Sequence, residues 1–154
     1  MGIRERLKEL SIELPPTPPA LGAYLPAVRV GEWVYTSGQL PLVGGVLQVR
    51  GRLGQELSVE EGYQAARVAC LNALAAAAEV TDLDLIERVV KVTGYVASAP
   101  GFHQQPAVIN GASQLLLDIF GEAGRHARAA VGVAELPQGA PVEIELVLLV
   151  RSGG

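Results

Sequence analysis

The carboxy-terminal segment PVEIELVLLV limits the possible folds more than any other part of the sequence, because as a strand it is apolar on both faces. Side chains alternate between the two faces of a strand. Val147 and Leu149 therefore lie on the face opposite a wholly apolar one, and the segment Val89–Val96 has a similar pattern. A solvated face would alternate with polar residues, so we expect both faces of the sheet to be covered. The wholly apolar face carries Val142, Ile144, Leu146, Leu148 and Val150.

The rest of the chain predicts the element order β-β-β-α-β-α-β-β. Three short antiparallel strands are expected first, with turns at Gly31-Glu32 and Gly44-Gly45. Ser58 and Glu61 form the pattern of a capping box, so a long helix is expected over 59–79. A second helix is expected over 106–120, and strands are expected over 89–96, 127–136 and 141–150.

This order predicts an α+β domain with both helices on one face of a mixed sheet. Two helices cannot cover both faces of the apolar strands described above. The mean hydropathy of +0.31 with only 18% charged residues also indicates apolar surface that a partner covers. We therefore expect the second face to pack against other subunits in a closed ring.

The first 19 residues are expected to form a separate appendage to a domain that spans 20–154. Residues 3–10 have the spacing of a short amphipathic helix, and four prolines between Leu14 and Ala20 form a stiff connector. On this interpretation the segment 1–19 is dispensable for folding.

Several function classes are excluded by composition. A net charge of −4 offers no basic surface for nucleic acid. One cysteine, Cys70, and two histidines supply neither a disulfide nor a zinc-binding pattern, and no nucleotide-binding motif is present, so no metal or cofactor is expected. No signal peptide or membrane-spanning segment is recognisable, which favours a cytoplasmic location. Cys70 is interpreted as a core residue.

Arg128 and Glu143 are the two strongest candidates for chemistry. Arg128 stands in a strand of small apolar residues, where its guanidinium needs an anionic partner such as a ligand carboxylate. The alternatives are that it reaches solvent at the strand edge or pairs with Glu143 or Glu145. Glu143 could orient a water molecule, or it could simply be solvated or paired with an arginine.

Three further residues could line a ligand pocket. Gly38 would let the backbone approach a ligand closely, or it would merely end a strand. Tyr24 and Tyr95 could supply an aromatic wall, or they could be ordinary half-buried side chains. No serine or cysteine shows a base in the spacings known for nucleophilic catalysis.

The chain resembles the Rid (YjgF) family, also known as L-PSP endoribonuclease-like proteins. The resemblance is carried by Tyr24 in AYLPAVRVGEWVYTSGQLP, by Asn110, and by the segments ARAAVGVAELP and VEIEL, and it covers Gly22–Arg151. It implies a chorismate-mutase-like homotrimer with a central barrel and ligand sites between subunits. The amino-terminal extension places the chain in a longer subgroup.

The same resemblance implies hydrolysis of 2-imino acids to 2-oxo acids and ammonia, without a cofactor. By carry-over, Arg128 clamps the substrate carboxylate and Glu143 holds the attacking water. The family often has cysteine where this chain has Ala130, so thiol chemistry is not expected. The residues expected to contact or line the substrate are Tyr24, Ser37, Gly38, Asn110 and the backbone at Ala130.

Two alternatives to an imine deaminase remain at this point. A trimeric protein that only binds small carboxylates or metabolites would use the same arginine clamp. A ribonuclease or translation inhibitor follows from the family's older name alone, and it ranks last because the chain is acidic and only 5% aromatic.

Overall fold

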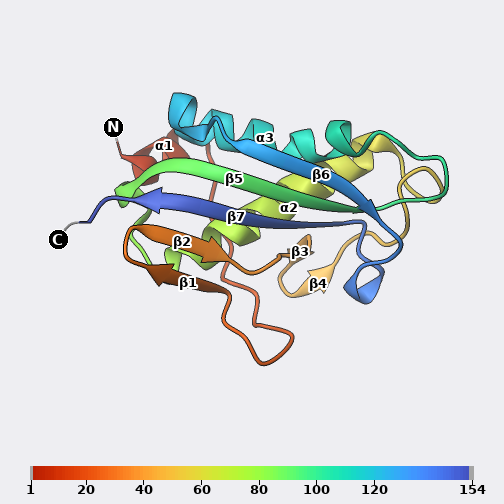
Figure 1. Ribbon diagram of the computed structural model, residues 1–154, viewed down its shortest axis with the longest axis horizontal. Coiled ribbons are helices and arrows are strands. Elements are labelled where there is room, and N and C mark those ends of the chain that lie inside the picture. The colour runs from red at the N-terminus through yellow and green to blue at the C-terminus, as the bar shows by residue number, and fades with distance from the viewer. Residues whose placement is uncertain (1, 153–154) are drawn as a thin grey trace.

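A computed structural model describes residues 2–152 and consists of a mixed five-stranded sheet with helices on one face (Figure 1). The strand order is β1-β2-β7-β5-β6, and only β5 and β6 run parallel. The strands of this sheet are β1 (Ala27–Val30), β2 (Trp33–Thr36), β5 (Ile86–Ala97), β6 (Ala127–Val133) and β7 (Val142–Val150).

The two long helices, α2 (Val59–Ala78) and α3 (Gln105–Phe120), lie side by side behind the sheet. The predicted capping box is confirmed, because the Ser58 hydroxyl accepts from the Glu61 amide and the Glu61 side chain accepts from the Ser58 amide. At Gly111 a β-carbon would overlap the backbone carbonyl of Tyr63, so this glycine lets α3 approach α2 closely. The predicted α+β class is thereby confirmed.

The core fills the space between these helices and the sheet. Every second residue of β7, from Val142 to Val150, is at most 1% exposed. Cys70 is also fully buried in the core, as predicted, and burial raises the pKa of its thiol to about 12. Such a thiol stays protonated near neutral pH and is a poor nucleophile.

The predicted number of short strands before α2 is wrong. Beyond β1 and β2, the segments β3 (Leu42–Val43) and β4 (Val46–Leu47) form a hairpin of their own outside the main sheet. Gly44 and Gly45 both have positive φ, which gives the tight turn between them. Leu40, Leu42 and Leu47 bury their side chains in a small separate cluster with Ala140. The hairpin thus has its own core and does not pair with the main sheet.

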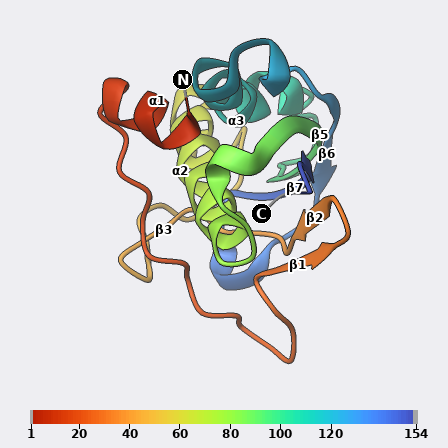
Figure 2. The same cartoon turned by 90° about the vertical axis from the view of Figure 1, so that its left-hand side faces the viewer.

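The amino-terminal segment is not an appendage. Helix α1 (Ile3–Glu9) buries Leu7 in the main core, and the Arg6 guanidinium donates to the Asp118 carbonyl at the end of α3. Further along, the Thr17 hydroxyl donates to the Ala75 carbonyl of α2. Figure 2 shows α1 beside the two long helices, with the connector running past them toward β1. The expected dispensability conflicts with this packing, whereas the domain boundary at 19/20 stays a prediction.

The sheet face opposite the helices carries many apolar side chains. Val28 and Tyr35 face each other across β1 and β2, and Tyr35 also pairs with Val147 of β7. Tyr35 is 47% exposed. Other exposed apolar side chains on this face are Val30, Trp33 and Val131. We call this surface the open face. It matches the predicted second apolar face, and its coverage by other subunits stays a prediction.

Within residues 2–152, none of the helices has both the length and the apolar character that crossing a bilayer requires.

Candidate functional site

Arg128 lies on the helix side of the edge strand β6. It pairs in register with Val92, which is fully buried beneath the helices, so both side chains point toward the helical layer. The Arg128 Nη1 atom donates to the Asn110 Oδ1 atom at 2.8 Å and to the Ser113 Oγ atom at 3.1 Å. A longer contact of 3.4 Å joins its Nη2 atom to the Pro106 carbonyl. All these acceptors come from α3, and all are neutral.

A histidine stands behind this arginine. The His126 Nε2 atom is 2.8 Å from the Ser113 Oγ atom, and its Nδ1 atom is 2.6 Å from the Gly124 carbonyl oxygen. Burial lowers the pKa of His126, and the nearby charge of Arg128 acts in the same direction. Burial also lowers the pKa of Arg128. We refer to Arg128, Asn110, Ser113 and His126 as the arginine cluster.

Glu143 lies on the open face, at the start of β7. It pairs in register with Tyr95, three residues along β5 from the Val92 that marks the helix side. A β-carbon at Gly38 would lie 2.8 Å from the carboxylate carbon of Glu143, so any side chain at this position would force the Glu143 side chain to move. Burial raises the pKa of Glu143, and the neighbouring Glu145 raises it further.

The Tyr95 hydroxyl donates a hydrogen bond of 2.7 Å to the Glu145 carboxylate, which raises the pKa of Tyr95 to about 12. Tyr95 therefore acts as a fixed donor near neutral pH. Glu145 lies beside Glu143, two residues away on the same face. We refer to Glu143, Glu145, Tyr95 and Gly38 as the glutamate cluster.

The other predicted residues divide between these two clusters. Tyr24 and Gly38 both line a small cavity of about 20 Å³ beneath the proline connector. The Ser37 hydroxyl donates to the Leu25 carbonyl at 2.6 Å, so it fixes the loop that carries Tyr24. Ala130 lies two residues after Arg128 and pairs with Gly94, on the helix side of the sheet.

The two strongest candidates are thus on opposite faces of the sheet within one chain. The interpretation that Arg128 pairs with Glu143 or Glu145 is wrong, because its acceptors are Asn110, Ser113 and Pro106. No acidic side chain among residues 2–152 forms an ion pair with Arg128. One chain therefore presents an uncompensated cation on one side and a carboxylate pair on the other.

Ser113 and His126 were not among the site residues predicted from the sequence. Two spacings could have indicated them: Asn110 and Ser113 are three residues apart on a helix, and His126 and Arg128 are two apart at a strand, so each pair shares a face. What the spacing could not show is that α3 and β6 bring these pairs together.

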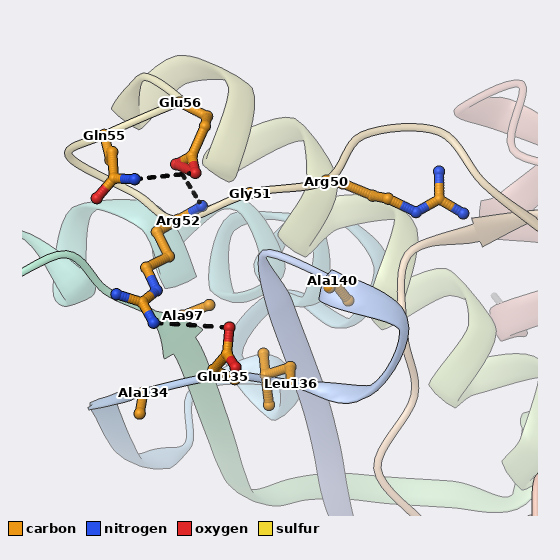
Figure 3. Close-up of a pocket in the computed structure, with 11 residues that line it drawn as sticks. Arg50, Gly51, Arg52, Gln55, Glu56, Ala97, Ala134, Glu135, Leu136 and Ala140 are labelled. Atoms are coloured by element: carbon orange, nitrogen blue, oxygen red, sulfur yellow. Dashed lines mark hydrogen bonds and ion pairs between the residues drawn. The ribbon is translucent and has the colours of Figure 1, made fainter.

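A cavity of about 360 Å³ lies elsewhere, between the loop before α2 and the loop after β6 (Figure 3). It contains no predicted site residue. Arg52 and Glu135 form an ion pair of 3.6 Å in it, and Glu56 accepts from the Arg52 amide. The Arg50 guanidinium points away from Arg52, so the two arginines do not converge on a common ligand. Among residues 2–152, no group of three His, Cys, Asp or Glu side chains is placed to hold a metal ion.

A family model described as "YjgF/chorismate_mutase-like, putative endoribonuclease" matches residues 4–147. The chain belongs to this YjgF (Rid) family. The match begins within α1, so it includes most of the segment 1–19, which lies before the stretch Gly22–Arg151 that carried the resemblance in the sequence.

Two relatives illustrate the range of the family. The chain is 44% identical to Protein TCP17 of Trypanosoma cruzi, over 95% of this chain and 92% of that protein. It is 32% identical to a 2-iminobutanoate/2-iminopropanoate deaminase of Dermatophagoides farinae, over 91% of this chain and 95% of the relative. Of these two relatives, the one with the lower identity has a name that states an enzymatic activity.

Solved structures confirm the fold. A crystal structure from Shewanella oneidensis MR-1, with the same endoribonuclease description, superposes with a TM-score of 0.93 at 36% identity and covers 97% of this chain and 100% of that one. The YjgF gene product of E. coli gives a TM-score of 0.62 at 26% identity and covers 90% and 94%. The higher score accompanies the greater coverage of this chain.

Proposed function

We propose that this protein hydrolyses 2-imino acids to 2-oxo acids and ammonia without a cofactor, in sites formed between the subunits of a homotrimer. The observation that carries the proposal is the set of groups that surround the Arg128 side chain. Its guanidinium is held by neutral acceptors of α3 and has no acidic partner among residues 2–152. A planar cation fixed in this way suits a small carboxylate.

Glu143 supports the second part of the proposal. Its raised pKa makes the carboxylate a stronger base than an exposed glutamate, so it can hold and polarise a water molecule. The water adds to the imine carbon, and ammonia then leaves as the carbonyl forms. An imine is already reactive toward water, so orientation supplies much of what the reaction needs.

Assembly would complete the part of the proposed site that a single chain lacks. Because Arg128 and Glu143 lie on opposite faces, they can act on one substrate only if a neighbouring subunit supplies one of them. The exposed apolar side chains of the open face give such an interface a driving force. The relative named as a 2-iminobutanoate/2-iminopropanoate deaminase indicates the class of substrate.

In the test, an amino-acid oxidase generates 2-imino acids in situ, and the release of 2-oxo acid is followed with and without the protein. Glu143→Gln should lower turnover at least about a hundredfold, the size typical of a lost acid–base group, while 2-oxobutanoate still binds. Arg128→Ala should abolish binding of 2-oxobutanoate, and Arg128→Lys should retain part of it.

Each outcome distinguishes the candidate functions. Unchanged binding after Arg128→Ala would show that the carboxylate site is wrong. Binding that depends on Arg128, with no turnover by the wild type, favours a second candidate, a trimeric protein that binds small carboxylates. One observation supports that candidate: the arginine cluster is complete within a single chain and needs no residue of the open face.

A further inference from the structure

The hydrogen bonds of the arginine cluster have a direction that the chemistry of each atom fixes. A carbonyl oxygen only accepts, so the His126 Nδ1 atom must carry a proton to bond to Gly124. In the neutral ring the Nε2 atom then has no proton and accepts from the Ser113 hydroxyl. The Ser113 oxygen is left to accept from Arg128. The chain of donors therefore runs from Arg128 to Ser113, then to His126.

We propose that His126 is a positioning residue for Arg128 and acts on it through the Ser113 hydroxyl. Without His126 the hydroxyl could turn its proton toward a carbonyl of the preceding helical turn, as serines in helices do. With His126 in place, that proton is committed to Nε2, and a lone pair of the oxygen faces the guanidinium. The inference rests on the function proposed above in one respect, since it takes a carboxylate as the ligand of Arg128.

We call the donor chain from Arg128 through Ser113 to His126 the relay. Its last member, the His126 ring, is fixed by the backbone carbonyl of Gly124. Gly124 closes the short 3₁₀ turn Gly121–Gly124, and a β-carbon there would overlap the Leu116 carbonyl of α3. The Arg125 side chain pairs with Glu122 at 3.1 Å, and its carbonyl accepts from Arg88 at 2.8 Å. The turn that presents the Gly124 carbonyl thus packs against α3 and is joined to β5 through the Arg88–Arg125 hydrogen bond.

The lowered pKa of His126 agrees with this arrangement: burial is the largest cause and Arg128 acts in the same direction, and together they outweigh the hydrogen bond to Gly124, which raises the pKa. Asn110 completes the arrangement from the same helix face. Its Oδ1 atom accepts the other hydrogen bond from Nη1, so two acceptors of α3 define the position of this end of the guanidinium.

A first experiment needs no ligand. Nitrogen NMR of the free wild-type protein should show a proton on the Nδ1 atom of His126 and none on Nε2 near neutral pH. Ser113→Ala should shift the Nε2 signal of His126, leave the exposed His103 unchanged, and speed the rotation of the Arg128 guanidinium. A proton on Nε2, or an unaltered guanidinium in Ser113→Ala, would overturn the relay whatever the protein binds.

A second experiment compares two replacements of His126 by calorimetry with 2-oxobutanoate. His126→Gln reaches the position of Nε2 with an amide oxygen and should keep affinity within about twofold. His126→Asn reaches only the position of Nδ1, leaves Ser113 without its acceptor, and should weaken binding about tenfold, the size of one hydrogen bond. A merely structural role would affect both variants alike, and equal losses would overturn the proposal.

The two experiments also separate this inference from the proposed function. If the wild type fails to bind 2-oxobutanoate, or if Arg128→Ala leaves binding unchanged, the carboxylate site is wrong. The relay is then tested by the NMR measurement on the free protein alone. A proton on the His126 Nδ1 atom and slow rotation of the Arg128 guanidinium support it, and the absence of either overturns it.

Discussion

The arginine cluster and the glutamate cluster differ in how completely one chain builds them. In the first, Arg128 donates hydrogen bonds to acceptors of α3, and His126 is held by the turn that follows α3. In the second, Glu143 rests against Gly38 on a face whose other side chains are largely apolar and exposed. Rigid packing thus fixes one cluster, whereas the other lies on a surface suited to a partner.

The proposed carboxylate-binding arginine and the proposed catalytic glutamate are therefore preorganised in different ways. The arginine cluster depends on the position of α3 against β6, and α3 in turn packs on α2, so the cluster should respond to changes in the core. The glutamate cluster depends on what covers the open face, so it should respond to assembly. Four predictions test this difference and are given in order of decreasing effect.

The largest effect is expected from a charge on the open face. Tyr35→Asp would place a carboxylate in the centre of the apolar surface, and we expect a complete loss of trimer and of imine turnover. Binding of 2-oxobutanoate to the arginine cluster should be weakened less than turnover. Sedimentation equilibrium and the imine assay measure the two effects.

Val46→Asp is the matched control, because Val46 is 59% exposed but lies in the separate β3–β4 hairpin. It should leave assembly intact. A trimer that survives Tyr35→Asp, or one that Val46→Asp dissociates, would contradict the assignment of the open face as the interface.

The second effect concerns the helix contact that supports the arginine cluster. Gly111→Ala should lower the free energy of unfolding by about 3 kcal/mol, because the new methyl group would meet the Tyr63 carbonyl of α2. Helix propensity alone predicts the opposite sign, a gain of about 1 kcal/mol. Denaturant unfolding distinguishes the two expectations by the sign of the change in the free energy of unfolding. A stabilised variant would show that α2 can move away.

The third effect concerns α1, which braces the far end of α3. Leu7→Ala should cost about 2 to 3 kcal/mol of stability, since Leu7 is buried in the main core. Leu21→Ala is the control, because Leu21 is 58% exposed, and it should change stability little. Equal stabilities of the two variants would restore the interpretation of residues 1–19 as dispensable.

How far the sequence predicts the structure depends on the range of the contact. The Ser58–Glu61 capping box and the alternation of β7 are local patterns, and both are confirmed. The sequence did not predict that β3 and β4 form a hairpin outside the main sheet. That arrangement depends on Leu40 and Leu47 packing against Ala140, which lies far along the chain. A local pattern contains no information about such a contact.

The candidate site shows the same limit. Arg128 and Glu143 were predicted as candidates from their residue types and from the family resemblance, but their opposite faces follow from the pairing of β5 with both β6 and β7. The proximity of Ser113 and His126 depends on the turn at Gly121–Gly124, which brings the chain back along α3. No spacing in the sequence specifies that return.

The smallest effect is a pH dependence in the glutamate cluster. The raised pKa of Glu143 means that the folded state binds this proton more tightly than the unfolded state does. Stability therefore falls as pH rises from about 4.3, the ordinary value for glutamate, through the raised pKa. Glu143→Gln removes this loss and should be slightly more stable near neutral pH, by less than about 1 kcal/mol because the side chain is only half-buried.

The difference between Glu143→Gln and the wild type should shrink as pH falls toward 4 and vanish below it, where the glutamate is protonated in both states. Denaturant unfolding of both proteins at a series of pH values measures this, with Glu87→Gln as the control at an exposed position of β5. Because Glu145 also raises the pKa of Glu143, Glu145→Gln should reduce the same pH dependence. A difference that grows toward low pH would contradict the burial of Glu143 as the cause and would place its carboxylate in a stabilising contact of the open face.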